Sequence, residues 1–89
     1  MRLHDEIDNK VVITTRYVLD AGSLITYVTY DDDGDWQFFG DEEVSENDAR
    51  VISVKQILAL DASLYSLPDL ELGQSASRLD EDSDWKRVK

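Results

Sequence analysis

The residues of this chain best suited to chemistry are clustered carboxylates. The segment YDDDGDWQFFGDEE, residues 30–43, places four aspartates around Gly34 and three more acidic residues directly after Gly40. Carboxylate oxygens are the preferred ligands of Ca²⁺ and Mg²⁺, and paired carboxyl groups can act as general acid and base. Each of these uses requires its own spacing or environment.

The spacing does not match an EF-hand calcium loop. Such a loop needs acidic or amide ligands at positions 1, 3 and 5, glycine at position 6 and glutamate at position 12. With Gly34 at position 6, Thr29 falls at position 1 and Gly40 at position 12, and neither supplies the required ligand. We expect a solvated turn with no metal site and no cofactor, and weak adventitious Ca²⁺ or Mg²⁺ binding is the alternative.

Other catalytic arrangements are also missing from the sequence. A carboxylic acid works as a general acid only where an apolar site raises its pKa, and acids crowded in a turn are usually exposed. His4 is the only histidine, there is no cysteine, and no glycine-rich phosphate loop occurs. The sequence therefore favours a protein that is not an enzyme, with a metal-dependent or carboxylate-based enzyme as an alternative.

Net charge narrows the choice of partner. The chain carries twenty acidic and nine basic residues, for a net charge of −11. This charge repels nucleic-acid phosphates and anionic membranes, whereas it attracts basic proteins. We expect a basic protein partner, no direct nucleic-acid contact and no membrane contact. One alternative is that the protein mimics a nucleic acid and occupies the basic groove of another protein. Another is that the charge only keeps the protein soluble. The candidate partner-binding residues are Asp31, Asp32, Asp33, Asp35, Trp36, Asp41, Glu42 and Glu43. For Trp36, a position in the core is favoured over a partner contact.

The length of 89 residues indicates one domain, residues 1–89, with an ordered core at about 10–79 and flexible tails. The lack of cysteine suits a reducing compartment. The charged N-terminus has no apolar signal segment, and no run approaches the roughly 18 apolar residues of a membrane span. These features predict a cytoplasmic protein and leave its oligomeric state open.

The clearest structural signal is a β-hairpin. Residues 24–30 and 35–39 are rich in β-branched and aromatic residues, and they flank Asp31–Gly34, which suits a tight turn with Gly34 left-handed. In that register Tyr30 lies opposite Trp36. One face of the hairpin then carries Thr26, Val28, Tyr30, Trp36 and Phe38, and the other carries Ile25, Tyr27 and Phe39.

The remaining elements predict an α+β fold with a mainly antiparallel sheet of four or five short strands and one or two short helices. Residues 11–15 and 50–53 are predicted strands, and residues 17–19 form a turn or a short helix. Ser53 and Gln56 form a capping box for a helix over 54–60, and Asp61 caps a turn that Pro68 ends. Residues 74–79 are expected as a last edge strand, and Trp85 either folds back on the sheet or stands exposed. The expected helical core stripe is Ile57, Leu58, Leu60, Leu64 and Leu67.

The order of these segments resembles a bacterial domain family without an assigned function. The resemblance covers residues 11–88: VVITTRYVLDAGS, the hairpin segment DGDWQFFGDEE, a Ser-capped helix, the turn DASL, a Leu-Pro segment, and Ala-Ser-Arg after a glycine. Asp35 between Gly34 and Trp36, and Ala62 in place of proline, depart from the family pattern. Some members are grouped with immunity proteins of polymorphic-toxin systems. The resemblance implies a small α+β protein that binds another protein, such as a toxin, and carries over no catalytic residue.

Overall fold

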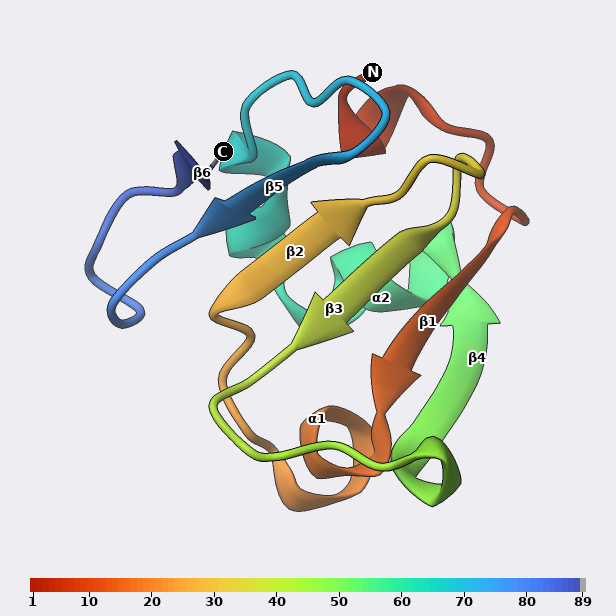
Figure 1. Cartoon of the computed structure of the whole chain (residues 1–89), viewed down its shortest axis with the longest axis vertical. Coiled ribbons are helices and arrows are strands. Elements are labelled where there is room, and N and C mark those ends of the chain that lie inside the picture. The colour runs from red at the N-terminus through yellow and green to blue at the C-terminus, as the bar shows by residue number, and fades with distance from the viewer. Residues whose placement is uncertain (89) are drawn as a thin grey trace.

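A six-stranded sheet in the order β4-β1-β3-β2-β5-β6 is the framework of the computed structural model, which describes residues 1–88 (Figure 1). β1 and β3 run parallel, and every other neighbouring pair is antiparallel. The mainly antiparallel α+β class is therefore confirmed. The strands are β1 Val11–Thr15, β2 Tyr27–Tyr30, β3 Trp36–Phe39, β4 Ala49–Ser53, β5 Gln74–Ser77 and β6 Lys86–Val88.

The predicted number of four or five strands was too low. β6, only three residues long, pairs with the outer side of β5. Segment 74–77 is therefore an inner strand rather than the edge strand expected. β6 was missed because Lys86–Arg87–Val88 has no alternating pattern of its own, and pairing with β5 decides its conformation.

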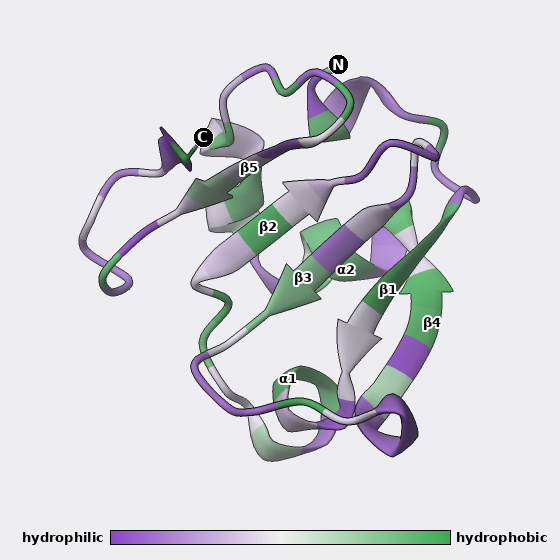
Figure 2. Cartoon of the chain, in the orientation of Figure 1, coloured by the Kyte–Doolittle hydropathy of each residue, from purple (hydrophilic) through white to green (hydrophobic). Residues whose placement is uncertain are grey.

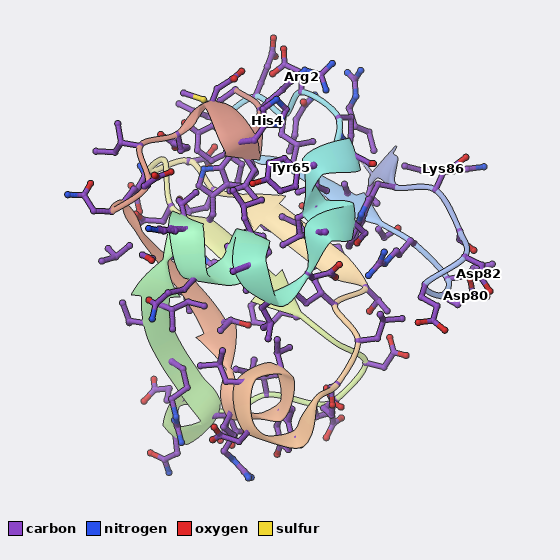
Figure 3. The ribbon with its side chains drawn as sticks, turned by 180° about the vertical axis from the view of Figure 1, so that it is seen from behind. Arg2, His4, Tyr65, Asp80, Asp82 and Lys86 are labelled. Atoms are coloured by element: carbon purple, nitrogen blue, oxygen red, sulfur yellow. The ribbon has the colours of Figure 1, made fainter. Side chains whose placement is uncertain are left out.

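In the described residues 1–88, helices cover one face of the sheet and leave the other without helical cover. The α-helices are α1 Arg16–Ala21 and α2 Val54–Leu60, and the 3-10 helices are η1 Leu3–Asp5, η2 Glu46–Asp48 and η3 Ala62–Ser66. α2 and η3 lie behind the sheet in Figure 1 and in front of it in Figure 3, where Tyr65 marks η3. Within residues 1–88, none of these helices has the length and apolar character needed to cross a membrane.

Local signals account for the helix ends. The predicted capping box is present, since the Ser53 side chain accepts from the Gln56 amide while the Gln56 side chain accepts from the Ser53 amide. Asp61 accepts from the Ser63 amide and so begins η3, as expected. Thr15 accepts from the Val18 amide, which makes residues 16–21 a helix rather than an irregular turn.

The predicted hairpin is confirmed in its register. Tyr30 pairs with Trp36 and Val28 with Phe38. The Gly34 amide donates to the Asp31 carbonyl at 3.0 Å, and Gly34 has a φ of 83°. This left-handed conformation favours glycine because a Cβ would crowd the neighbouring carbonyl.

The core lies between the sheet and the α2–η3 layer, and it extends beyond residues 10–79. Trp36 and Phe38 are fully buried against Ile57 and Leu64, which belong to the same cluster. Leu3 is also fully buried, and Trp85 is 8% exposed. Both ends of the described chain therefore contribute to the core, and Trp85 folds back rather than standing free.

Two residues lie elsewhere than predicted. Leu60 is 49% exposed because, at about 100° per residue, it lies roughly 120° away from the buried stripe of Val54, Ile57 and Leu58. Ile25 is 2% exposed rather than on the outer face of the hairpin. β2 begins only at Tyr27, so the alternation of a strand does not extend back to Ile25.

Candidate functional site

Within residues 1–88, no helix covers the sheet face opposite α2 and η3, and this face carries apolar side chains. We call it the open face, and strand alternation assigns to it Val11, Ile13, Thr15, Tyr27, Thr29, Gln37, Phe39, Ala49, Val51, Ser53, Ser75, Ser77, Lys86 and Val88. Val11 is 60% exposed and Val51 64% exposed. Figure 2 shows hydrophobic segments along β1 and β4. Ile13 lies opposite Val51 and Tyr27 lies opposite Phe39, so apolar residues are neighbours on this face.

The centre of the open face is an aromatic pair held by hydroxyl groups. Tyr27 and Phe39 face each other across β2 and β3, with ring centroids 6.5 Å apart. The Tyr27 hydroxyl donates to Ser75 Oγ at 3.0 Å, and Thr29 Oγ1 lies 2.9 Å from the same oxygen. The hydrogen bond to Ser75 is the first cause of a lowered pKa for the Tyr27 hydroxyl. These contacts fix the orientation of the Tyr27 side chain.

Carboxylates are absent from the open face but flank it at both ends of β3. No acidic residue is among the outward-facing positions of the six described strands. The turn bearing Asp31, Asp32, Asp33 and Asp35 precedes β3, and Asp41, Glu42 and Glu43 follow it. The structure therefore separates the predicted acidic residues into two groups and places apolar residues between them (Figure 2).

Asp31 organises the first acidic group. Its Oδ1 accepts from the amides of Asp33 and Asp35, both at 2.9 Å, and its Oδ2 accepts from Gln37 Nε2 at 2.9 Å. The amide of Asp35 is the main cause that lowers the pKa of the Asp31 carboxyl, and Gln37 adds to it. Asp31 is thus a turn-stabilising carboxylate that already has partners for both oxygens.

Three carboxylates of this turn come close enough to meet one cation. Asp31, Asp33 and Asp35 each offer an oxygen, and these oxygens lie within 4.8 Å of one another. A cation there would compete with the three hydrogen bonds that Asp31 accepts. Asp33 and Asp35 are exposed, so water would compete with their carboxylates for the cation and with the cation for the carboxylates. The geometry suits a weak, hydrated ion rather than a closed cage.

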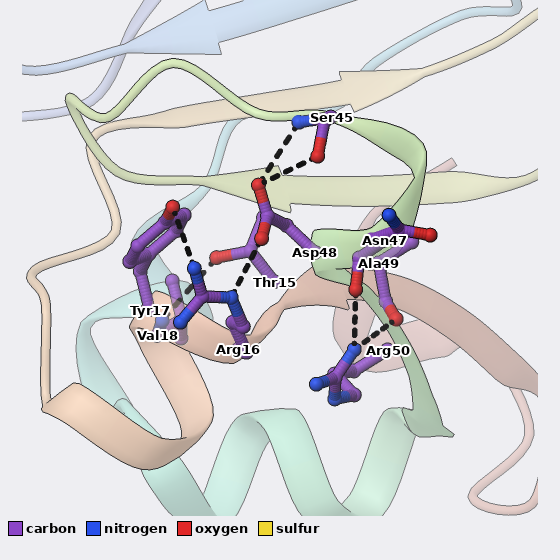
Figure 4. A network of polar contacts seen from close by, with 9 residues as sticks. All are labelled: Thr15, Arg16, Tyr17, Val18, Ser45, Asn47, Asp48, Ala49 and Arg50. Carbon is purple, nitrogen blue, oxygen red and sulfur yellow. Dashed lines mark hydrogen bonds and ion pairs between the residues drawn. The ribbon is translucent and has the colours of Figure 1, made fainter.

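The second acidic group is held against the start of β2. Thr26 Oγ1 donates to Asp41 Oδ1 at 2.8 Å, and Ser23 Oγ donates to Glu42 Oε2 at 2.5 Å. The far end of the same loop is fixed by Asp48, whose Oδ1 accepts from Arg16 Nε at 2.6 Å (Figure 4). The loop 40–48 therefore presents its exposed acids from a position fixed at both ends.

Asp48 serves structure rather than recognition. Besides Arg16, it accepts from the Ser45 amide at 3.0 Å and from Ser45 Oγ at 3.2 Å (Figure 4). The Ser45 amide, followed by the Arg16 guanidinium, lowers the pKa of Asp48 to about 2. Asp48 is 6% exposed, so it contributes little charge to a partner.

Trp36, one of the predicted partner-binding residues, lies in the core. It points away from the open face, is fully buried, and stacks on Tyr30 with ring centroids 4.4 Å apart. Its Nε1 donates to Glu6 Oε2 at 2.9 Å. Trp36 therefore supports the hairpin from beneath and is not available to a partner.

Sequence reasoning missed the aliphatic part of the open face. Val11 and Ile13 lie on β1 and Val51 lies opposite Ile13 on β4. Their signal was present, since 11–15 and 49–53 place apolar residues at alternate positions on both faces. A strand that is apolar on both faces is expected to be covered on both.

A cavity of about 390 Å³ lies beside the second acidic group. Val18, Leu24, Ile25 and Leu60 supply its aliphatic lining, and Asp61, Arg78 and Glu81 supply its charged lining. Arg78 is the buried member, with 2% of its side chain exposed. Its Nη2 donates to Asp61 Oδ2 at 3.0 Å, and its Nη1 donates to Ser63 Oγ at 2.7 Å.

Comparisons with protein-family models, with curated proteins and with solved structures give no match for this chain.

Proposed function

We propose that this chain is a non-catalytic protein-binding module whose open face docks a basic protein. The single observation that carries this proposal is the arrangement around β3. Exposed aliphatic residues and the Tyr27–Phe39 pair lie between two groups of carboxylates, and none of the carboxylates projects from the strands themselves. An apolar, charge-poor centre with a charged rim is the usual anatomy of a protein interface.

Charge selects the partner. A second copy of this chain would bring one acidic rim against another, and like charges across an interface cost several kcal/mol. A partner with an apolar centre and a basic rim would instead match both parts of the surface. Such a partner would also approach faster than a neutral one, because the net charge of −11 attracts it.

The family resemblance agrees with this proposal. Immunity proteins act by binding a toxin, and a toxin that attacks nucleic acid needs a basic surface. A basic toxin is therefore the partner class that we propose. The Tyr27–Phe39 pair would set the lifetime of the complex, because buried aromatic residues dominate interface energetics.

Paired apolar-to-acid substitutions test the proposal. Val51→Asp places a charge in the open face, whereas Leu72→Asp makes the same change at a residue that is 56% exposed and lies outside the face. Wild type and both variants are immobilised and challenged with the same bacterial lysate. The proposal predicts a basic protein that wild type and Leu72→Asp retain equally and that Val51→Asp loses at least about ten-fold, as expected for a charge buried without a partner.

Unfolding in urea shows whether Val51→Asp still folds. If a folded Val51→Asp variant captures every wild-type partner in full, the open face has no role in binding. Tyr27→Ala serves as a second variant, because Tyr27 is partly exposed and its loss removes aromatic contact area without adding a charge.

A further inference from the structure

We infer that the cavity beside Arg78 is a receptor for a lysine or arginine side chain of the basic partner. This inference rests on the proposed function, because the proposed basic partner supplies that side chain. The cavity's own chemistry defines the ligand as an alkyl chain that ends in a cation. Its volume of about 390 Å³ falls in the range of roughly 300–1,000 Å³ typical of small-ligand sites.

The walls suit the stem of such a side chain. Leu24 is 36% exposed and Leu60 49% exposed, and both contribute to the lining beside the buried Val18 and Ile25. Two exposed leucines that meet at one cavity leave apolar surface in water. The methylene groups of lysine or arginine cover such surface while the charged end stays near polar groups.

The charges at the cavity favour a cation over an anion. Among residues 1–88, Arg78 is the only positive lining residue, and Asp61 already pairs with that guanidinium at 3.0 Å. Glu81 also lines the cavity, is exposed, and has no ion-pair partner in the described chain. The formal charge of the charged lining is therefore −1. An anion would be repelled by this negative lining charge and by the net charge of −11 of the whole chain.

The carboxylate of Glu42, which is not part of the lining, is fixed next to the cavity. Ser23 is a lining residue, and its hydroxyl donates to Glu42 at 2.5 Å. Glu42 belongs to the acidic group that flanks the open face. Leu60 and Ser63 of the lining belong to the α2–η3 layer, on the side of the sheet opposite the open face. A basic side chain of a partner docked on the open face would therefore reach the cavity around the end of the sheet, past Glu42.

The test uses n-butylguanidinium as a probe and needs no identified partner. Amide shifts of ¹⁵N-labelled protein are followed by NMR as the probe is added. The expected result is saturable binding in the millimolar range, with shifts confined to residues 22–25, 60–63 and 78–81. n-Butylurea, which has nearly the same shape and no charge, should bind about three-fold more weakly or worse, the size expected of an exposed charge contact.

Variants assign the binding to the cavity. Leu24→Trp should abolish saturable shifts by filling the mouth, and Leu60→Ser serves where that variant does not fold. Glu81→Gln should weaken the probe about three-fold, whereas Glu71→Gln, the same change at an exposed glutamate outside the lining, should have no effect.

Three results would overturn the inference: no saturable shifts, equal binding of n-butylurea, or shifts centred on the acidic turn at 31–35. The proposed function fails by a different measurement, namely full partner capture by Val51→Asp. If the NMR titration shows no binding and Val51→Asp loses its partner, the cavity is not a side-chain receptor but the open face remains the docking surface.

Discussion

The guanidinium carbon of Arg78 lies 4.4 Å from the centroid of the Trp85 ring. Arg78 follows β5 and Trp85 precedes β6, so this contact joins the two ends of the loop that connects the last two strands. Arg78 also donates through Nε to the Ile25 carbonyl at 2.9 Å. One buried cation thus connects the start of β2, η3 and the C-terminal segment.

Replacing Trp85 should therefore cost much more than an ordinary tail substitution. Trp85 is 8% exposed and belongs to the core cluster, so Trp85→Ala is expected to lower the free energy of unfolding by about 3 kcal/mol or more. Urea unfolding followed by circular dichroism measures this change. Arg87→Ala, at an exposed neighbour, should change it by less than about 0.5 kcal/mol. Equal effects would mean that the segment 85–88 is not docked.

The loss of stability when Gly34 is replaced should depend on how readily the new residue adopts a left-handed backbone. With a φ of 83°, Gly34→Ala and Gly34→Val are expected to destabilise by more than about 1 kcal/mol. Gly34→Asn should cost less, since asparagine visits this region more readily. A Cβ at this position would have the Tyr30 hydroxyl as its nearest neighbour at 3.9 Å, so steric conflict does not confuse the comparison. A rank order with alanine better than asparagine would contradict this explanation.

Asp48 should make stability depend on pH between about 2 and 4. Its pKa is about 2 in the folded chain against an ordinary 3.8, because the Ser45 amide and Arg16 stabilise the carboxylate. The unfolded chain binds more protons in that window, so the contribution is complete above pH 3.8 and is lost as the pH falls toward 2. Asp48→Asn should therefore be less stable than wild type at pH 6 and close to it at pH 2.

Urea unfolding of wild type and Asp48→Asn across that pH range measures the difference directly. Asp84→Asn, at an exposed residue, is the matched control and should follow wild type throughout. A constant gap between Asp48→Asn and wild type from pH 2 to pH 6 would show that the amide fails for a reason other than charge.

The acidic turn should bind divalent cations only weakly. Both oxygens of Asp31 already accept hydrogen bonds from the turn, and Asp33 and Asp35 are exposed. Calorimetric titration with Ca²⁺ or Mg²⁺ is therefore expected to give a dissociation constant weaker than about 10⁻⁵ M, outside the range of calcium sensors. A tighter constant that Asp33→Asn removes would establish a metal site there.

The features that could be predicted depend on neighbours in sequence. The hairpin turn needs only Asp31 and Gly34 in their positions, and the α2 start needs only Ser53 and Gln56. The parallel pairing of β1 with β3, such as Ile13 opposite Gln37, depends instead on contacts across a long connection. No local pattern encodes that choice, so the strand order was not predictable.

The candidate site also combines features that neighbouring residues predict with features that depend on contacts across the sheet. The two acidic groups are visible as runs of carboxylates, whereas their separation by the open face depends on the sheet order. The core position favoured for Trp36 is confirmed, because the hairpin register that places it beside Val28 and Phe38 depends only on the local turn, whereas the prediction that it binds a partner was wrong. The Arg78–Asp61 pair, which brings residues 17 positions apart together at the cavity, had no signal beyond the residue types.

Charge reversal of the second acidic group should slow partner association without unfolding the protein. Asp41, Glu42 and Glu43 are exposed, so their charges contribute little to stability. The hydrogen bonds that Thr26 and Ser23 donate to this group would be lost, at a cost of about 1 kcal/mol each, which should leave the protein folded. Changing all three to lysine raises the net charge by six, and it removes the carboxylates beside both the open face and the cavity. Surface-plasmon kinetics with the partner recovered through the open face should show a lower on-rate for this variant. The wild-type on-rate should fall with salt, because the Debye length shrinks from about 10 Å at 0.1 M to about 3 Å at 1 M.

The matched control is Glu71→Lys, Asp82→Lys and Asp84→Lys, which makes the same change in net charge at exposed sites outside the two acidic groups (Asp82 is labelled in Figure 3). If recognition depends on where the carboxylates lie, the control should keep most of the wild-type on-rate at 0.15 M salt. If only the total charge matters, both triple variants should slow equally. An on-rate that neither variant changes, and that salt leaves constant, would remove the acidic groups from recognition altogether.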